Sequence, residues 1–302
     1  MVDRHRHLRL GAGWVRQETS GFGPFVTREV LRRVDGTVVV WESRRHRKGR
    51  TSAGGSTWWA PRAIGWWIGV LFAIGSFCFA LGAFPPYADA VGSAADNITY
   101  FVGSLFFTSA AFLQYCQVVW ADGRPERPHP LAIIRDLVRP QRERIDWWAA
   151  AVQFVGTLFF NVSTGHAVAA SQGSSSALNH LVWRPDALGS VCFLVASWLC
   201  WAEVSHRWWS WQPRSITWWI AGLNLVGSIA FGVSAVASKI EPNGSLRSLA
   251  LTNLGTFVGA VCFLVGGLLL LPERTQGDRV EPDLAASAYK SGLRGAPLAE
   301  SA

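Results

Sequence analysis

IGWWIGVLFAIGSFCF, residues 64–79, contains a tryptophan pair followed by a Gly-Ser step and a phenylalanine. Eight positions separate the second tryptophan from the glycine of that step, and the phenylalanine follows four later. The same spacing returns in WWAAAVQFVGTLFF from Trp147 and in WWIAGLNLVGSIAF from Trp218. Self-similarity of this kind predicts a repeated structural unit.

Three further apolar segments carry the second half of the pattern without the tryptophans: GSLFF, GSVCF and GAVCF. We call the shared pattern, G-[STA]-x-x-F, the notch motif. Its members are Gly75, Ser76, Phe79, Gly103, Ser104, Phe107, Gly156, Thr157, Phe160, Gly189, Ser190, Phe193, Gly227, Ser228, Phe231, Gly259, Ala260 and Phe263. One match would mean little in an apolar segment, but six matches indicate duplication of a helical hairpin.

Six apolar stretches are each about the 20 residues that a helix needs to cross a bilayer. They lie near 63–83, 98–120, 147–169, 186–204, 216–238 and 249–271. None has Lys, Arg, Asp or Glu in its middle, as a hydrocarbon environment demands. We therefore predict an all-α integral membrane protein with six transmembrane helices, arranged as three antiparallel hairpins, rather than a soluble protein. The polar, basic first 60 residues do not resemble a cleaved signal peptide.

The formal charge of +8 is distributed unevenly along the chain. Basic residues cluster before the first predicted helix, between the second and third, in the loop after the fourth, and after the sixth: Arg44, Arg45, Arg47, Lys48, Arg50, Arg124, Arg127, Arg135, Arg139, Arg142, Arg144, Arg207, Arg214, Arg274 and Arg279. Residues 84–97 hold two aspartates and no basic residue. This bias predicts a multi-pass membrane protein with both termini cytoplasmic. Arg greatly outnumbers Lys, which is typical of GC-rich bacterial genes, so we expect the membrane to be a bacterial plasma membrane. Anionic lipid headgroups are the expected partner of the first basic run, in preference to nucleic acid.

The notch motifs place a small residue and a ring at complementary depths on antiparallel helices. We expect Phe107 to pack over Gly75 and Ser76, while Phe79 packs toward Gly103 and Ser104, and the other two hairpins to behave alike. Small residues let membrane helices approach closely, where van der Waals packing is the main attractive force. The alternative is that the notches join one hairpin to the next.

The paired GSFCF and GSLFF segments resemble the YrhK-like hairpin, a small two-helix membrane domain. VWESRRHRKG, together with WWAP, is similar to the lead-in of larger actinobacterial proteins of that group. The resemblance covers residues 61–120 well and is weaker later, where Thr157 and Ala260 replace serine. It implies a helical-hairpin fold and brings no activity or catalytic residues.

Two alternating apolar and polar runs flank Asp35-Gly36, a preferred hairpin turn, so we predict a cytoplasmic β-hairpin. The connector is expected to include a short surface helix from about 131 to 138. The predicted units are a basic N-terminal segment 1–60 with the β-hairpin around 25–47, hairpin 1 (61–123), a connector (124–145), hairpin 2 (146–204), a loop (205–215), hairpin 3 (216–273) and a disordered tail (274–302).

Polar residues inside the predicted spans are the natural place to seek function. The candidates for a polar path are Gln153, Asn224, Asn161, Asn253 and Gln114. They could instead make hydrogen bonds between helices. Gln153 and Asn224 occupy equivalent positions, three residues before a notch glycine, where the first unit has Phe72.

The sequence contains little that indicates catalysis or metal binding. Glu203 and His206 form Glu-x-x-His, a spacing used in di-iron bundles, but a second such motif is missing. All five cysteines lie in or at the ends of the spans, which favours helix packing over disulfides or zinc. We therefore expect no enzyme, metal or cofactor.

Two classes of function remain. We favour a structural or regulatory membrane protein, acting as a homo-oligomer or beside a membrane-protein partner. The alternative is a small-solute channel or transporter with its path between the three repeated hairpins.

Overall fold

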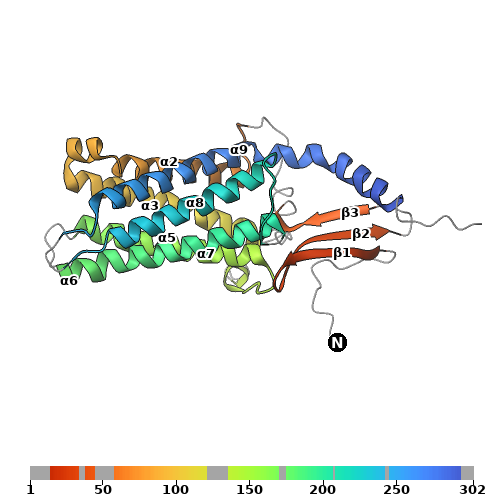
Figure 1. Ribbon diagram of the computed structural model, residues 1–302, viewed down its shortest axis with the longest axis horizontal. Coiled ribbons are helices and arrows are strands. Elements are labelled where there is room, and N and C mark those ends of the chain that lie inside the picture. The colour runs from red at the N-terminus through yellow and green to blue at the C-terminus, as the bar shows by residue number, and fades with distance from the viewer. Residues whose placement is uncertain are drawn as a thin grey trace, which may run out of the picture.

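The structure is a computed structural model that describes residues 14–33, 38–44, 58–120, 135–169, 175–206, 208–241 and 245–293. It consists of a helical bundle with a small β-sheet at one end (Figure 1). The helices are α2 (Ile64–Gly82), α3 (Pro85–Val119), α5 (Ile145–Ala169), α6 (Ser175–Leu178), the π-helix η1 (Asn179–Trp183), α7 (Arg184–Ser205), α8 (Ile216–Ala237) and α9 (Leu249–Leu293). The strands are β1 (Trp14–Phe22), β2 (Phe25–Arg33) and β3 (Val38–Glu42).

The six long helices of the described residues form a closed ring. Each packs against the next in the order α2, α3, α5, α7, α8 and α9, and α9 packs back against α2. Two glycines make the closing contact: a Cβ on Gly69 would lie 2.9 Å from the carbonyl oxygen of Gly267, and one on Gly267 would lie 3.1 Å from the amide nitrogen of Ala73. The first and last helices therefore meet backbone to backbone.

Each notch glycine lies against the phenylalanine of its partner helix. A Cβ on Gly75 would lie 3.1 Å from Phe107 Cδ2, and one on Gly103 would lie 2.9 Å from Phe79 Cδ2. In the other two pairs, the shortest distance from such a Cβ to an atom of the partner ring is 3.0 Å for Gly156 and Phe193, 3.4 Å for Gly189 and Phe160, 3.2 Å for Gly227 and Phe263, and 2.8 Å for Gly259 and Phe231. The contacts thus run within the pairs α2/α3, α5/α7 and α8/α9.

The six notch phenylalanines meet in the bundle centre. Rings from α2, α5 and α8 lie 6.0–6.3 Å apart, and rings from α3, α7 and α9 lie 5.8–6.3 Å apart. The two triangles are joined by ring contacts of 5.2–5.6 Å within each helix pair. We call the set Phe79, Phe107, Phe160, Phe193, Phe231 and Phe263 the phenylalanine prism. Its side chains are only 3–7% exposed.

The tryptophan pairs anchor the starts of α2, α5 and α8 in one way. The indole nitrogen of each second tryptophan donates to the carbonyl six residues earlier: Trp67 to Pro61 (2.9 Å), Trp148 to Arg142 (3.2 Å) and Trp219 to Pro213 (2.9 Å). These three side chains are 37–46% exposed. Amphipathic rings in this position are typical of a membrane–water boundary.

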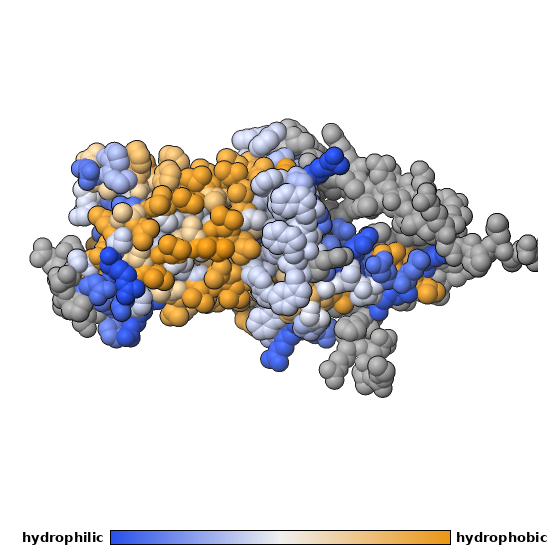
Figure 2. Space-filling model, viewed as in Figure 1, coloured by the Kyte–Doolittle hydropathy of each residue, from blue (hydrophilic) through white to orange (hydrophobic). Residues whose placement is uncertain are grey.

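Apolar side chains cover the outside of the bundle, and more hydrophilic surface lies at both ends (Figure 2). By length and composition, five helices could cross a membrane: Ile64–Gly82, Pro85–Val119, Asn179–Ser205, Ile216–Ala237 and Leu249–Glu273. The 25-residue α5 is not among them, because Gln153, Asn161 and His166 lie within it. Of the six expected spans, five are therefore supported by composition.

Three predicted non-helical segments are helical here. Residues 84–97, expected as a loop, belong mostly to α3, whose Pro85-Pro86 start suits a first helical turn. A kink at Gly92, with φ of +79°, accommodates this extension as only glycine readily does. α6 and η1 occupy part of a second loop. α9 continues through Leu293, where we expected disorder after residue 273; extending a formed helix avoids the cost of nucleation.

The N-terminal sheet has the strand order β1-β2-β3 and is antiparallel throughout. The predicted pairing on either side of Asp35-Gly36 is confirmed as β2 with β3, although this turn lies outside the described residues. Strand β1 was not predicted, because WVRQETSGF lacks a clear apolar alternation. Of the expected connector helix, residues 135–138 are helical and 131–134 are not described.

Phe79→Ala tests the phenylalanine prism, with Phe77→Ala as a matched control on the same helix. Phe79 is 5% exposed and Phe77 is 56% exposed. Removing a core ring leaves a cavity and should lower the free energy of unfolding by about 3–5 kcal/mol. The outward ring should cost about 0.5 kcal/mol or less. Denaturant titration in mixed micelles measures both; equal losses would contradict the prism as the stabilising core.

Candidate functional site

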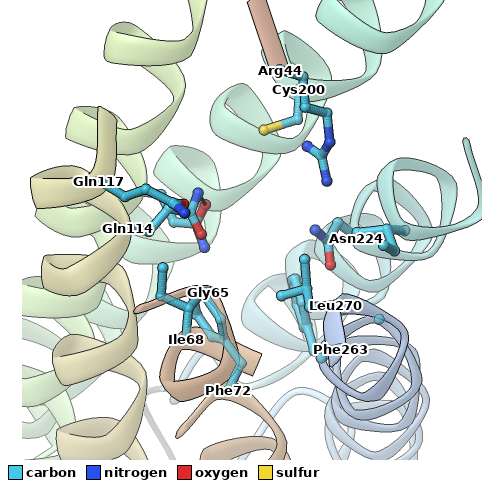
Figure 3. A pocket seen from close by; sticks show the side chains of 14 residues that line it. Arg44, Gly65, Ile68, Phe72, Gln114, Gln117, Cys200, Asn224, Phe263 and Leu270 are labelled. Carbon is cyan, nitrogen blue, oxygen red and sulfur yellow. Dashed lines mark hydrogen bonds between the residues drawn. The ribbon is translucent and has the colours of Figure 1, made fainter. Parts of the chain in front are cut away.

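A cavity of about 60 Å³ lies between the phenylalanine prism and the sheet (Figure 3). Arg44, just after β3, and residues from all six long helices contribute to its wall. The lining residues are Arg44, Gly65, Ile68, Phe72, Gln114, Gln117, Gln153, Cys200, Ile220, Asn224, Phe263, Gly266, Gly267 and Leu270. Phe263 belongs to the prism, and the Phe72 ring lies 5.8 Å from that of Phe107, so the prism forms the cavity floor.

Equivalent positions of alternate helices converge on this cavity. Phe72, Gln153 and Asn224 each lie three residues before the notch glycine of α2, α5 and α8. The residues eleven after the notch glycine of α3, α7 and α9 also line it: Gln114, Cys200 and Leu270. The cavity therefore sits where the helices of the ring face one another, and its polarity varies around the ring.

The structure brings together three of the five polar-path candidates. Gln114 Nε2 donates to Gln153 Oε1 over 3.4 Å, and Asn224 faces them across the cavity. Asn161 instead donates from Nδ2 to the hydroxyl of Thr108 at 2.9 Å. Asn253, in the second turn of α9, is not part of the lining. The candidates thus do not trace one continuous path through the bundle.

Arg44 closes the sheet side of the cavity. We expected it in a basic run facing lipid headgroups, but its side chain is only 14% exposed and points toward the cavity (Figure 3). Its Nε donates to Glu273 Oε1 at 2.9 Å, and that oxygen also accepts from Thr217 Oγ1 at 3.0 Å. The attraction of the buried carboxylate outweighs exposure to water or headgroups. The rest of the run, residues 45–50, lies outside the described residues.

The Glu-x-x-His motif holds the sheet on the bundle. Glu203, 1% exposed, accepts a 2.5 Å hydrogen bond from the Ser43 hydroxyl. The hydroxyl of Thr27, near the start of β2, is 2.8 Å from Nδ1 of His206. These partners make the motif a docking contact. Within the described residues, no group of three His, Cys, Asp or Glu side chains is placed to hold a metal ion.

An aromatic contact reinforces this docking. The Phe22 ring, at the β1–β2 turn, packs edge-on against Trp198 and Trp208, with centroid distances of 5.1 and 4.7 Å. The sheet is therefore held by both polar and aromatic groups at the tryptophan-rich end of the bundle.

Sequence reasoning missed several site residues. Gln117, Glu203 and Glu273 all lie fourteen residues after a notch glycine, on α3, α7 and α9. Extending the repeat register past the notch would have identified this polar layer. Nothing in the sequence distinguishes Arg44 from the exposed arginines around it, because its role depends on where β3 ends.

We compared the chain with family models, curated proteins and solved structures, and none matches.

Arg44→Gln tests the contact between the sheet and the bundle, with Arg28→Gln as control. Removing one partner of a buried ion pair strands the Glu273 charge and should cost about 3–5 kcal/mol. Arg28 pairs with Glu42 at 3.7 Å in a half-buried setting, where such pairs contribute about 0–1 kcal/mol. Two measurements should separate the variants: the free energy of unfolding in mixed micelles, and the rate at which proteinase K, which does not require arginine, cleaves within residues 14–33. Indistinguishable variants would argue against this anchor.

Proposed function

We propose that this chain is a non-conducting integral membrane protein of a bacterial plasma membrane, with a structural or regulatory role and no enzymatic activity. The observation that carries the proposal is the phenylalanine prism. Six buried rings fill the centre of the helical ring, at the level where a transmembrane path would have to pass. Aromatic side chains in edge contact leave no room for a hydrated path.

The proposal includes α5 as a sixth span. It lies in the ring between α3 and α7, and its polar groups are used inside the bundle: Gln153 lines the cavity, and Asn161 bonds to α3. Its outward side chains Val155, Leu158 and Val162 are apolar and 43–47% exposed. A helix that satisfies its polar groups internally and presents an apolar face is suited to lipid.

We infer that the three helix pairs are three copies of a YrhK-like hairpin. The repeated glycine–phenylalanine contacts and tryptophan anchors support this. The sheet end, with its exposed tryptophans and the arginines of residues 135–144, would face the cytoplasm and its anionic headgroups. A sheet docked there suits contact with a second copy or a membrane-protein partner.

A small-solute channel is the second candidate, because Gln114, Gln153 and Asn224 share one cavity. Amide side chains can line a path for neutral solutes. The cavity, however, stops at Phe72 and Phe263. The channel would need the prism to open.

Single cysteines in a cysteine-free background test the number of spans. Val138 is exposed in the short helical turn before α5, and Gln212 is exposed in the loop after α7, both at the sheet end. If both helices cross the bilayer, Val138→Cys and Gln212→Cys should react with an impermeant maleimide from the same, cytoplasmic side. If α5 does not cross, the two cysteines should react from opposite sides. Arg247→Cys, at the far end, serves as the control that reacts from outside.

Solute flux separates the two candidates. Liposomes containing the protein should take up glycerol and urea at the rate of empty liposomes in stopped-flow light scattering, because the prism blocks the centre. Protein-dependent uptake that is lost in Asn224→Leu would instead establish the channel.

A further inference from the structure

The cavity holds amide groups whose hydrogen-bonding capacity the protein does not use. No partner for the Asn224 side chain is found among the described residues. Gln114 and Gln153 share one long bond of 3.4 Å, which leaves most of their capacity open. Each amide can donate two hydrogen bonds and accept two.

Such groups are costly inside a bundle unless something pairs with them. An amide removed from water without a partner costs about 1–3 kcal/mol. At about 60 Å³ the cavity has room for about four water molecules. The cavity must therefore contain polar material, either water or a solute of similar total size.

The lining selects among solutes by charge. Arg44 faces the carboxylate of Glu273, so the one positive group in the described lining is already compensated. The remaining polar lining consists of neutral amides, which both donate and accept. Phe72, Ile68 and Leu270 add an apolar side. This combination favours a neutral molecule with a polar end and a small apolar end over an ion.

We propose that this cavity binds a small neutral solute of the simple amide, urea or short polyol class, held by Asn224, Gln153 and Gln114. The inference goes beyond the proposed function, since it requires neither conduction nor a particular orientation in the membrane. Because Arg44 lies two residues after the end of β3 and lines the same cavity, bound solute would contact the residue that fastens the sheet. The site would thus be a receptor cavity on one side of the prism.

Acetamide is a suitable probe, because it has four non-hydrogen atoms, an amide and a methyl group. Thermal unfolding of the full chain in lipid nanodiscs would be followed while acetamide is titrated, with sodium acetate at matched ionic strength as the charged probe. Ligand that binds only the folded state raises the Tm in a saturable way.

Two variants alter the cavity differently. Asn224→Leu removes the amide at nearly constant volume. Gly266→Val fills the space instead, since a Cβ there would lie 3.1 Å from Asn224 Oδ1. Gly232→Val, on the same α8 as Asn224, is the control, because nothing lies within 4 Å of a Cβ at that position. Two variants are used so that the test still gives an answer if one of them does not fold.

The expected result is a saturable rise in Tm with acetamide in the wild type and in Gly232→Val. The half-saturating concentration should rise about tenfold or more in Asn224→Leu and Gly266→Val, as loss of a buried hydrogen-bond partner implies. Acetate should have no saturable effect. A shift that is absent, non-saturable or equal in all four proteins would overturn the proposal and leave a cavity filled by water alone. Stronger binding of acetate would overturn the neutral class.

Discussion

The bundle depends on the contact between each notch glycine and the phenylalanine of its partner helix. Without a hydrophobic effect between helices in lipid, close packing must supply the attraction. The six glycines let the helix pairs approach until each ring rests on backbone, and the same contact aims all six rings inward. The phenylalanine prism is therefore a consequence of helix spacing, and it in turn fixes the distance across the ring. Gly69 and Gly267 close that ring on the same principle.

A filled centre divides the interior of the bundle into two ends. Polar side chains at the sheet end are separated by the prism from those toward the far end, where the hydroxyls of Ser104 and Thr164 lie 3.0 Å apart. The sheet end also carries the buried carboxylates Glu203 and Glu273, which need hydrogen-bond partners beyond the Thr217 hydroxyl of α8. β3 delivers two of these partners, Ser43 and Arg44, at adjacent positions. The sheet thus completes the bundle electrostatically, and this explains why it docks at that end.

The sequence allowed prediction of the features that repeat. Trp67, Gly75 and Phe79 recur at fixed spacing, and the local physics of each unit follows from that spacing. Features set by a single element were not accessible: the early start of α3 depends on Pro85 and a kink at Gly92, and both lie in polar sequence without apolar periodicity. Likewise, β1 is recognisable only by its pairing with β2. Three of the four amides that line the cavity were identified from the sequence, but Gln117 was missed, and the arginine comes from a segment that follows a distant strand.

Positions that are identical in all three units build the scaffold, so specificity must come from positions that differ. The layer three residues before the notch contains Phe72, Gln153 and Asn224, which gives one apolar wall and two polar ones. A symmetric set of three phenylalanines would have extended the prism and left no cavity. Three amides would have made a polar well without an apolar side. The mixture yields a small, asymmetric space above a rigid floor, and a rigid floor is what allows a small solute to be distinguished from water by shape as well as by hydrogen bonds.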